Sequence, residues 1–194
     1  AYSQLYNIFR QNTTNFLREF SVVSVCGICY TGYKEGLYME KTNVMRILDA
    51  AKIAYRVFEY EVDENNLAGT HIADEIGLAY EKVFKTLVAR GDKTGPVVFC
   101  IPADLEIDLK KAARVTGNKR IEMIHVKDLL ALTGYIRGGC SPIGMKKRFP
   151  TFISHHASEQ PEITVSAGVR GAQLLLNTKE LIAFVDAKCE DITV

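Results

Sequence analysis

The segment from Val83 to Ala89 constrains the fold of this chain more than any other. Its composition predicts a β-strand, and because side chains alternate between the two faces of a strand, both of its faces are mainly apolar. A strand that is apolar on both faces is normally covered on both, which favours a layered fold. The ammonium group of Lys85, in the middle of this strand, must then be desolvated, form an ion pair, or point into a cleft, and each arrangement costs free energy. The simpler interpretation is an edge strand, with the stem of Lys85 packed and its ammonium group in water.

Helices and strands alternate along the chain from about residue 39. Apolar periodicity predicts the helices, with Thr42 and Asn177 as capping residues. We expect helices at 42–51, 70–76, 108–116 and 126–133 and after Asn177, and strands at 55–61, 83–89, 97–101, 120–124, 149–153, 162–166 and 172–176. Short strands joined partly by turns and partly through helices indicate a mixed α/β (α+β) fold, with a barrel-like β-sheet surrounded by helices.

The first 38 residues differ from the remainder in composition. They are rich in Asn, Thr, Ser and Tyr and show no sustained periodicity. We therefore interpret 1–38 as an extension and 39–194 as the folded domain. Cys26 and Cys29 form a C-x-x-C pair within this extension, but the sequence has no second pair for zinc.

Composition limits the class of protein. A chain of 194 residues is long enough for one well-buried core, and its formal charge of +1 excludes a protein that coats DNA through bulk electrostatics. It allows an RNA enzyme with one local basic patch. Five cysteines are an odd number without the spacing of a disulfide framework, so we expect a reducing, cytoplasmic location. The apolar run at 20–30 is too short to span a bilayer, and we predict no membrane partner.

Two glycine-rich segments are candidate binding loops. The first, from Gly138 to Gly144, contains adjacent glycines, which let backbone groups approach a ligand closely. It lacks the Gly-Lys-Ser/Thr ending of a nucleotide P-loop, and a tight turn before a strand is the alternative interpretation. The second, at 166–171, joins two strands and carries Arg170, which is either a phosphate ligand or an ordinary surface arginine. The basic run at 146–148 suits an RNA backbone, although such runs are often solvated surface.

Cys140, within the first loop, is a further chemical candidate. It is a nucleophile only if a histidine lies nearby, and the sequence offers His125, His155 and His156 without placing one beside it. Zincin motifs, nucleophile elbows and paired carboxylates are missing from the sequence. We therefore predict no metal and no cofactor.

Four of these segments, taken in order, resemble the YbaK/EbsC family. They are VFKTL at 83–87, TGYIRGGCSPIG at 133–144, KKR at 146–148 and SAGVRG at 166–171, and the resemblance extends over about 41–194. It implies a mixed α/β, barrel-like domain that acts in trans as a Cys-tRNA(Pro) deacylase. Such proteins are related to the editing domain of bacterial prolyl-tRNA synthetase. The implied partners are the acceptor end of a mischarged tRNA and prolyl-tRNA synthetase, with no role for DNA.

The resemblance also implies roles for individual residues. Lys85 falls on the family's functional lysine and is the expected catalytic residue. The expected substrate-binding residues are Tyr60, Thr86, Gly138, Gly139, Cys140, Ser141, Pro142, Ser166, Gly168, Arg170 and Gln173. Two positions depart from some family members: Ala68 stands where they have a pocket phenylalanine, and Gln173 where they have an aspartate. These departures leave the amino-acid preference open.

The chemistry that the family implies needs no protein nucleophile. There the thiol of the substrate cysteine attacks its own ester carbonyl, so Cys140 should be dispensable. Two alternatives remain from different classes. One is a deacylase for Ala-tRNA(Pro) or another small amino acid, in which water attacks, and the other is a non-catalytic module that binds tRNA or a nucleotide.

Overall fold

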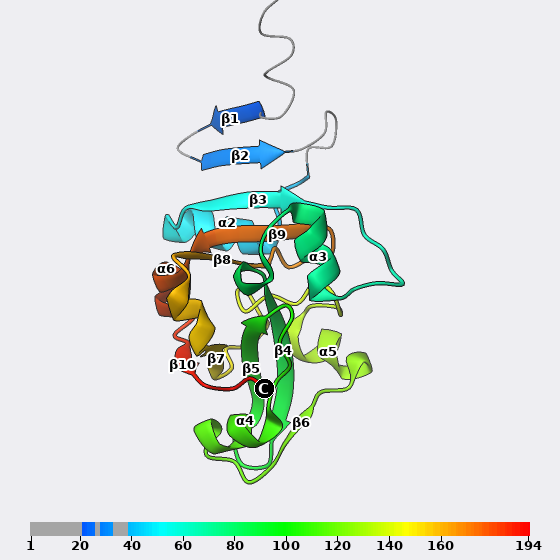
Figure 1. Ribbon diagram of the computed structural model, residues 1–194, viewed down its shortest axis with the longest axis vertical. Helices are drawn as coiled ribbons and strands as arrows, with labels where there is room; N and C mark the ends of the chain where they lie inside the picture. Colours follow the sequence, from blue (N-terminus) through cyan, green and yellow to red (C-terminus); the bar gives the residue numbers. More distant parts are fainter. Residues whose placement is uncertain (1–20, 26–27, 33–38) are drawn as a thin grey trace, which may run out of the picture.

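Two β-sheets form the framework of the molecule (Figure 1). The computed structural model describes residues 21–25, 28–32 and 39–194. The five-stranded sheet has the order β10-β7-β5-β4-β6 and the three-stranded sheet the order β3-β9-β8. Their strands are β3 (Tyr55–Glu59), β4 (Phe84–Gly91), β5 (Gly95–Pro102), β6 (Ile121–Met123), β7 (Thr151–Ser154), β8 (Glu162–Ser166), β9 (Ala172–Asn177) and β10 (Lys188–Glu190). An antiparallel hairpin of β1 (Ser21–Val25) and β2 (Ile28–Gly32) precedes them.

Local sequence signals set the ends of the helices. The helices described are α2 (Asn43–Ala51), α3 (Gly69–Ile76), α4 (Leu109–Thr116), α5 (Val126–Thr133) and α6 (Thr178–Phe184), with 3-10 helices η1 (Tyr80–Lys82) and η2 (His155–Glu159). The side chains of Thr42 and Asn177 accept backbone hydrogen bonds at the N-termini of α2 and α6, as predicted. Gly77, Gly117 and Gly134 follow α3, α4 and α5 with positive φ, which glycine adopts without strain.

Strand β4 is covered on both faces over much of its length. Phe84 and Val88 belong to the core between the two sheets, whereas Leu87 and Ala89 pack into a second cluster with side chains of α4. An isolated parallel bridge, Val83–Thr164, links the two sheets beside the start of β4. The sheets thus enclose one core as a partly open barrel. The predicted mixed α/β, barrel-like fold is confirmed.

Strand boundaries differ from the predicted ones where pairing partners end. β3 stops at Glu59, which pairs with Ala172 at the first position of β9. β7 begins at Thr151, where its parallel pairing with β5 starts. The sequence does not predict β10, η1 and η2, because elements of three to five residues depend on tertiary contacts rather than on their own periodicity.

The amino-terminal stretch is only partly described. Cys26 of the C-x-x-C pair lies outside the described residues, and the division of the chain at residue 39 stays a prediction. None of the helices that the structure describes is both long and apolar enough to cross a membrane.

Candidate active site at the open edge of β4

A cavity of about 480 Å³ opens along one edge of β4. β6 pairs with residues 89–91 of β4, and the Ile124 N–H also donates to the Val88 carbonyl, so the edge at residues 85–87 is left uncovered on that side. The other walls come from the start of α3, the loop after β5, the junction between β6 and α5, the loop at 137–140 and the ends of β8 and β9. Segments far apart in the sequence therefore meet around the strand that carries Lys85.

Lys85 lies in the β4 wall of this cavity and is only weakly held. Its side chain is 23% exposed, and its Nζ lies 2.9 Å from Oε1 of Glu106, whose side chain is 78% exposed. The β4–β5 hairpin places Lys85 opposite Ile101 and so brings the following loop, with Glu106, back to the lysine. An ion pair with so exposed a partner contributes little, and a ligand oxygen can replace the carboxylate. The two interpretations from the sequence, a lysine on an edge strand and a lysine that opens into a cleft, each apply in part. The edge of β4 is open beside Lys85, and its ammonium group lies in a cavity.

The backbone of Thr86 faces the cavity. The Ala103 N–H donates to the Val83 carbonyl at 2.7 Å, so the odd-numbered residues of β4 direct their backbone groups toward β5. The backbone groups of the even-numbered residues point toward the other edge. There the Ile124 N–H donates to the Val88 carbonyl at 3.0 Å, whereas none of the described strands pairs with Thr86 at this edge. Thr86 therefore presents one N–H and one C=O to a ligand, as the edge strand of a sheet presents them to a further strand.

An unpartnered acceptor lies in the opposite wall. Gln173 is 4% exposed, and its Oε1 has no hydrogen-bond partner among the described residues. A buried acceptor without a partner costs about 1–3 kcal/mol, and a donor on a ligand in the cavity would recover that energy. Tyr60 lies next to Gln173. Burial raises the pKa of the Tyr60 hydroxyl, and a hydrogen bond with the Gln173 side chain lowers it by a smaller amount.

Arg170 fixes the two glycine-rich turns to each other. Its Nε donates to the Arg137 carbonyl at 2.9 Å, and its guanidinium group pairs with Glu64 at 3.2 Å. The turns also touch directly, since a Cβ on Gly139 would lie 3.0 Å from the carbonyl carbon of Val169. The packing of the two turns therefore favours a glycine at 139, and protein groups already pair with Arg170.

Cys140 lines the cavity as a neutral thiol. Burial raises the pKa of the Cys140 thiol to about 12, and that of the Cys100 thiol likewise to about 12. Such a thiol stays protonated at neutral pH and is a weak nucleophile. Of the described residues that line the cavity, none is a histidine that could deprotonate it. The geometry therefore gives the cysteine-nucleophile interpretation no support.

The predicted site residues divide into two groups. Those that line the cavity are Lys85, Thr86, Gly138, Cys140, Ser166 and Gln173; those that do not are Tyr60, Gly139, Ser141, Pro142, Gly168 and Arg170. Ala68 also lines the cavity. Pro142 instead lines a second cavity of about 460 Å³, together with Lys147 and Arg148. Lys146 donates to backbone carbonyls near the end of α5, so the basic run at 146–148 lies outside the cavity of Lys85.

Several lining residues are not predicted from the sequence. For Glu106 a signal exists, because the turn at 91–95 predicts a hairpin whose register brings the chain after Ile101 back to Lys85. Met123 and Val126, at the mouth of the cavity, carry no such signal. Each is one apolar residue in a short element, and only the tertiary structure places the two together.

Known proteins match both the sequence and the fold. Residues 70–184 match the family model described as an aminoacyl-tRNA editing domain. A protein of Enterococcus faecalis, named as a provisional Cys-tRNA(Pro)/Cys-tRNA(Cys) deacylase, EbsC, is 47% identical over 154 residues, which are 79% of this chain and 94% of that protein. The chain belongs to the aminoacyl-tRNA editing domain family.

Two further relatives place this editing domain in its wider context. A proline–tRNA ligase of Thermodesulfovibrio yellowstonii is 26% identical over 147 residues, which are 75% of this chain and 24% of the ligase. A crystal structure described as a provisional trans-editing enzyme for prolyl-tRNA synthetase superposes with a TM-score of 0.65 at 25% identity, over 72% of this chain and 87% of that chain. The resemblance to the YbaK/EbsC family is thereby confirmed.

Proposed function

We propose that this editing-domain protein is a deacylase that removes cysteine wrongly attached to tRNA(Pro). The observation that carries the proposal is the set of groups around one cavity: an ammonium group, an open strand edge and an unpartnered amide oxygen, beside a thiol, that of Cys140, which stays protonated. An aminoacyl ester is already activated, so a site need only orient it and stabilise the charge that develops on oxygen. The name of the relative at 47% identity supports this substrate.

Each group has a role that its position permits. The Oε1 of Gln173 accepts a hydrogen bond from the α-ammonium group of the attached amino acid, which supplies its missing donor. The backbone of Thr86 and the turn at Gly138 hold the ester and the terminal ribose from opposite walls. The ammonium group of Lys85 leaves Glu106 and stabilises the negative charge on the reacting oxygens.

The substrate supplies the nucleophile in this scheme. The sulfur of the attached cysteine forms a bond to its own carbonyl carbon, and the ester C–O bond breaks. The thiol proton passes to the departing ribose oxygen, so the products are uncharged tRNA and a four-membered thiolactone, which water opens to free cysteine. No protein side chain forms a covalent bond, in keeping with the high pKa of Cys140.

A panel of charged tRNAs tests the proposal. Enzyme in excess over tRNA(Pro) charged with cysteine, 2-aminobutyrate, alanine or serine should release cysteine fastest. The 2-aminobutyrate ester, which has a methyl group in place of the thiol, should decay at nearly the uncatalysed rate. Equal rates for cysteine and 2-aminobutyrate would show that water attacks and would favour the small-amino-acid deacylase. Binding of the tRNA without release of any amino acid would favour the non-catalytic module.

We also propose prolyl-tRNA synthetase as a partner, with both proteins in the cytoplasm. The support is that a proline–tRNA ligase contains a stretch related to this chain. Addition of a synthetase with an inactivated active site should then raise the rate of Cys-tRNA(Pro) deacylation at limiting enzyme. An unrelated synthetase serves as the control, and an equal effect of the two would contradict the partnership.

A further inference from the structure

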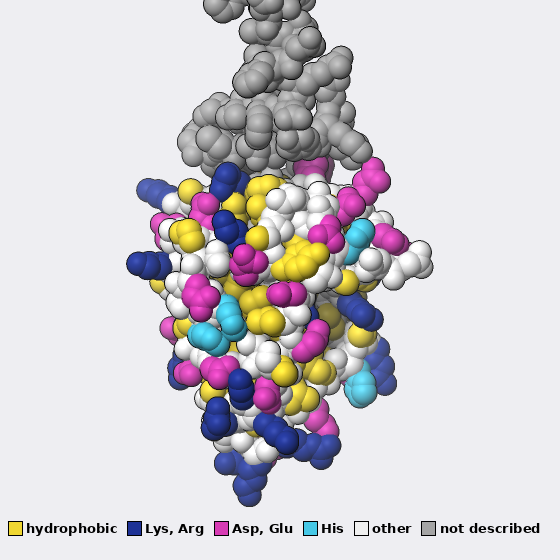
Figure 2. Space-filling view, in the orientation of Figure 1, with side chains coloured by type: hydrophobic (Ala, Val, Ile, Leu, Met, Phe, Trp, Pro, Cys, Tyr) yellow, Lys and Arg dark blue, Asp and Glu magenta, His cyan; other side chains and the backbone are white. Residues whose placement is uncertain are grey.

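Charge is distributed unevenly around the cavity, although the chain as a whole carries +1. The stretch from Glu59 to Glu81 contains seven acidic residues and no Lys or Arg. The stretch from Arg90 to Arg120 contains seven Lys and Arg and only four Asp and Glu. The first stretch includes α3 and the first two residues of η1, whose last residue is Lys82, and the second includes the β4–β5 turn and α4 at the opposite end, where Figure 2 shows Lys and Arg side chains gathered.

Most of the cations at this end are available to a ligand. Six exposed side chains make up what we call the cationic tip: Arg90, Lys93, Lys110, Arg114, Lys119 and Arg120. Within residues 39–194, Arg120 pairs with Glu122, and the other five side chains form no ion pair. Two nearby carboxylates are engaged by backbone N–H groups, since Asp92 accepts from residues 119 and 120 and Asp108 from the first turn of α4.

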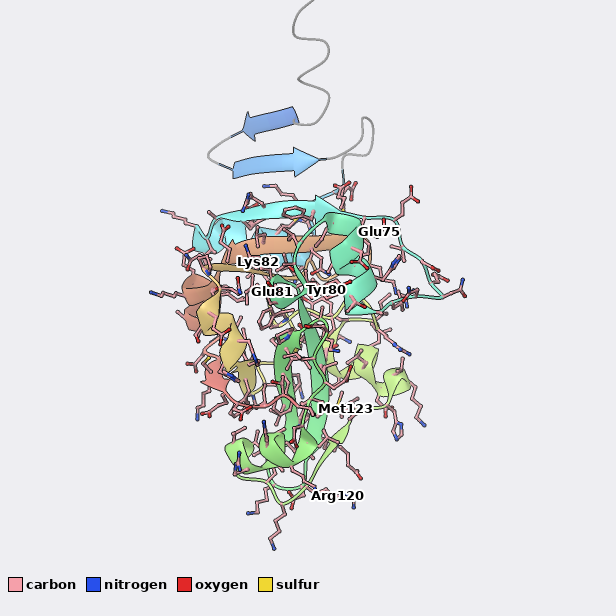
Figure 3. All side chains as sticks on the ribbon, in the orientation of Figure 1. Glu75, Tyr80, Glu81, Lys82, Arg120 and Met123 are labelled. Carbon is pink, nitrogen blue, oxygen red and sulfur yellow. The ribbon has the colours of Figure 1, made fainter. Side chains whose placement is uncertain are left out.

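Two exposed apolar side chains lie at the mouth of the cavity, and the strand that carries one of them leads to the cationic tip. Met123, at the end of β6, is 42% exposed, and Val126, at the start of α5, is 58% exposed; both line the cavity. β6 runs from Met123 back toward Arg120, and Figure 3 shows these two side chains along the same side of the molecule. The neighbouring strand spans six positions from Lys85 to Gly91, which is about 20 Å at the usual rise of a strand.

We propose that the cationic tip binds the sugar–phosphate backbone of an RNA stem whose unpaired 3′ end runs over Met123 into the cavity. The inference rests on the proposed function, because it requires the reacting ester to lie at Lys85. Unpaired nucleotides present apolar base faces and regularly spaced phosphates, which fit the exposed Met123 and Val126 at the cavity mouth and the cations beyond them. The seven carboxylates between Glu59 and Glu81 disfavour the opposite path by repulsion of the phosphates; Figure 3 places Glu75 and Glu81 at that end, with Lys82 beside them.

Two triple variants with the same change of charge test this surface. The tip variant is Lys93→Gln, Lys110→Gln and Lys119→Gln. The control variant, Lys52→Gln, Lys179→Gln and Lys188→Gln, removes exposed cations from the end of α2, from α6 and from β10. Fluorescence anisotropy with uncharged tRNA(Pro) over a series of salt concentrations measures Kd without any need for catalysis.

The tip variant should bind at least about tenfold more weakly at low salt, and its slope of log Kd against log salt should fall by roughly two to three, near 0.9 per lost phosphate contact. The control variant should match the wild type. A tip variant with wild-type affinity and slope would overturn the proposal, as would an equal loss in the control variant.

Substitution of Met123 tests the path between tip and cavity. Met123→Glu and Met123→Lys place opposite charges at the same exposed position, so any effect on folding is shared. The Glu variant should weaken tRNA binding and the Lys variant should not, whereas equal affinities would contradict this path. If the wild type binds tRNA through the tip but deacylates none of the charged tRNAs, the proposed function fails while the RNA surface stands.

Discussion

Lys85→Met removes the ammonium group from the cavity and keeps a side chain of similar length. The stem of Lys85 is largely covered by the protein, and methionine can fill the same space. The ion pair that is lost has a partner 78% exposed, so its contribution to stability is about 0–1 kcal/mol. The free energy of unfolding should therefore change by no more than ~1 kcal/mol, measured by urea denaturation.

The effect on catalysis should be much larger. Loss of one preorganised donor to a developing oxyanion typically lowers kcat by about 10²- to 10³-fold. We expect a loss in that range for single-turnover deacylation of Cys-tRNA(Pro) by Lys85→Met, because the other cation among the described cavity residues, Arg137, lies beside the Gly138 turn and not on β4. Tight binding of uncharged tRNA should persist, since the cationic tip is unchanged.

Glu106→Gln is the matched control. It breaks the same ion pair but leaves the ammonium group in place, so a purely structural role of the pair predicts equal effects of the two substitutions. We expect Glu106→Gln to stay within about fivefold of the wild type, the equivalent of ~1 kcal/mol. A Lys85→Met enzyme with a rate close to that of Glu106→Gln would refute the assignment of Lys85.

Three further substitutions test the site and its supports. Cys140→Ser should keep most of the activity between pH 6 and 9, because the Cys140 thiol, with a pKa of about 12, stays protonated there; a loss on the order of 10²-fold or more would instead indicate a cysteine nucleophile. Gly139→Ala should lower the free energy of unfolding by about 1–3 kcal/mol, since its Cβ would press on the backbone of Val169, and an unchanged urea midpoint would contradict that contact. The backbone N–H groups of Lys111 and Lys110 hold the pKa of Asp108 below its usual value. Its contribution to stability is therefore present above the unfolded-state pKa and lost as pH falls through the lower folded-state pKa, so urea titrations below pH 4 should show a smaller acid-dependent loss for Asp108→Asn than for the wild type.

Several elements follow from local sequence because their causes are local. Thr42 and Asn177 cap their helices through their own side chains. Gly117 ends α4 because the residue after the last turn has a positive φ, which glycine adopts without strain. The coverage of β4 follows from its apolar composition on both faces. The short β10 could not be predicted, since its pairing with β7 joins segments more than thirty residues apart.

The candidate site was predictable only where its residues stand out in their local sequence. Lys85 and the Gly138 turn are unusual within their own segments and therefore visible in the sequence. The role of Arg170 was not, because the guanidinium group bonds to the Arg137 carbonyl and to Glu64, and neither partner is a sequence neighbour. Likewise the sequence suggests that Gly139 belongs to a ligand-binding loop, whereas the structure shows it where the backbone of Val169 approaches closely, a position that favours glycine.

The amino-acid sequence by itself determined which segments become helices and strands and which strand carries a lysine between apolar neighbours, because propensity, capping and alternation act over a few residues. Only the tertiary structure decided that β6 covers just the far end of β4. That short pairing leaves the edge beside Lys85 open, and the folding of distant segments around it brings Glu106 and the unpartnered oxygen of Gln173 to the same cavity.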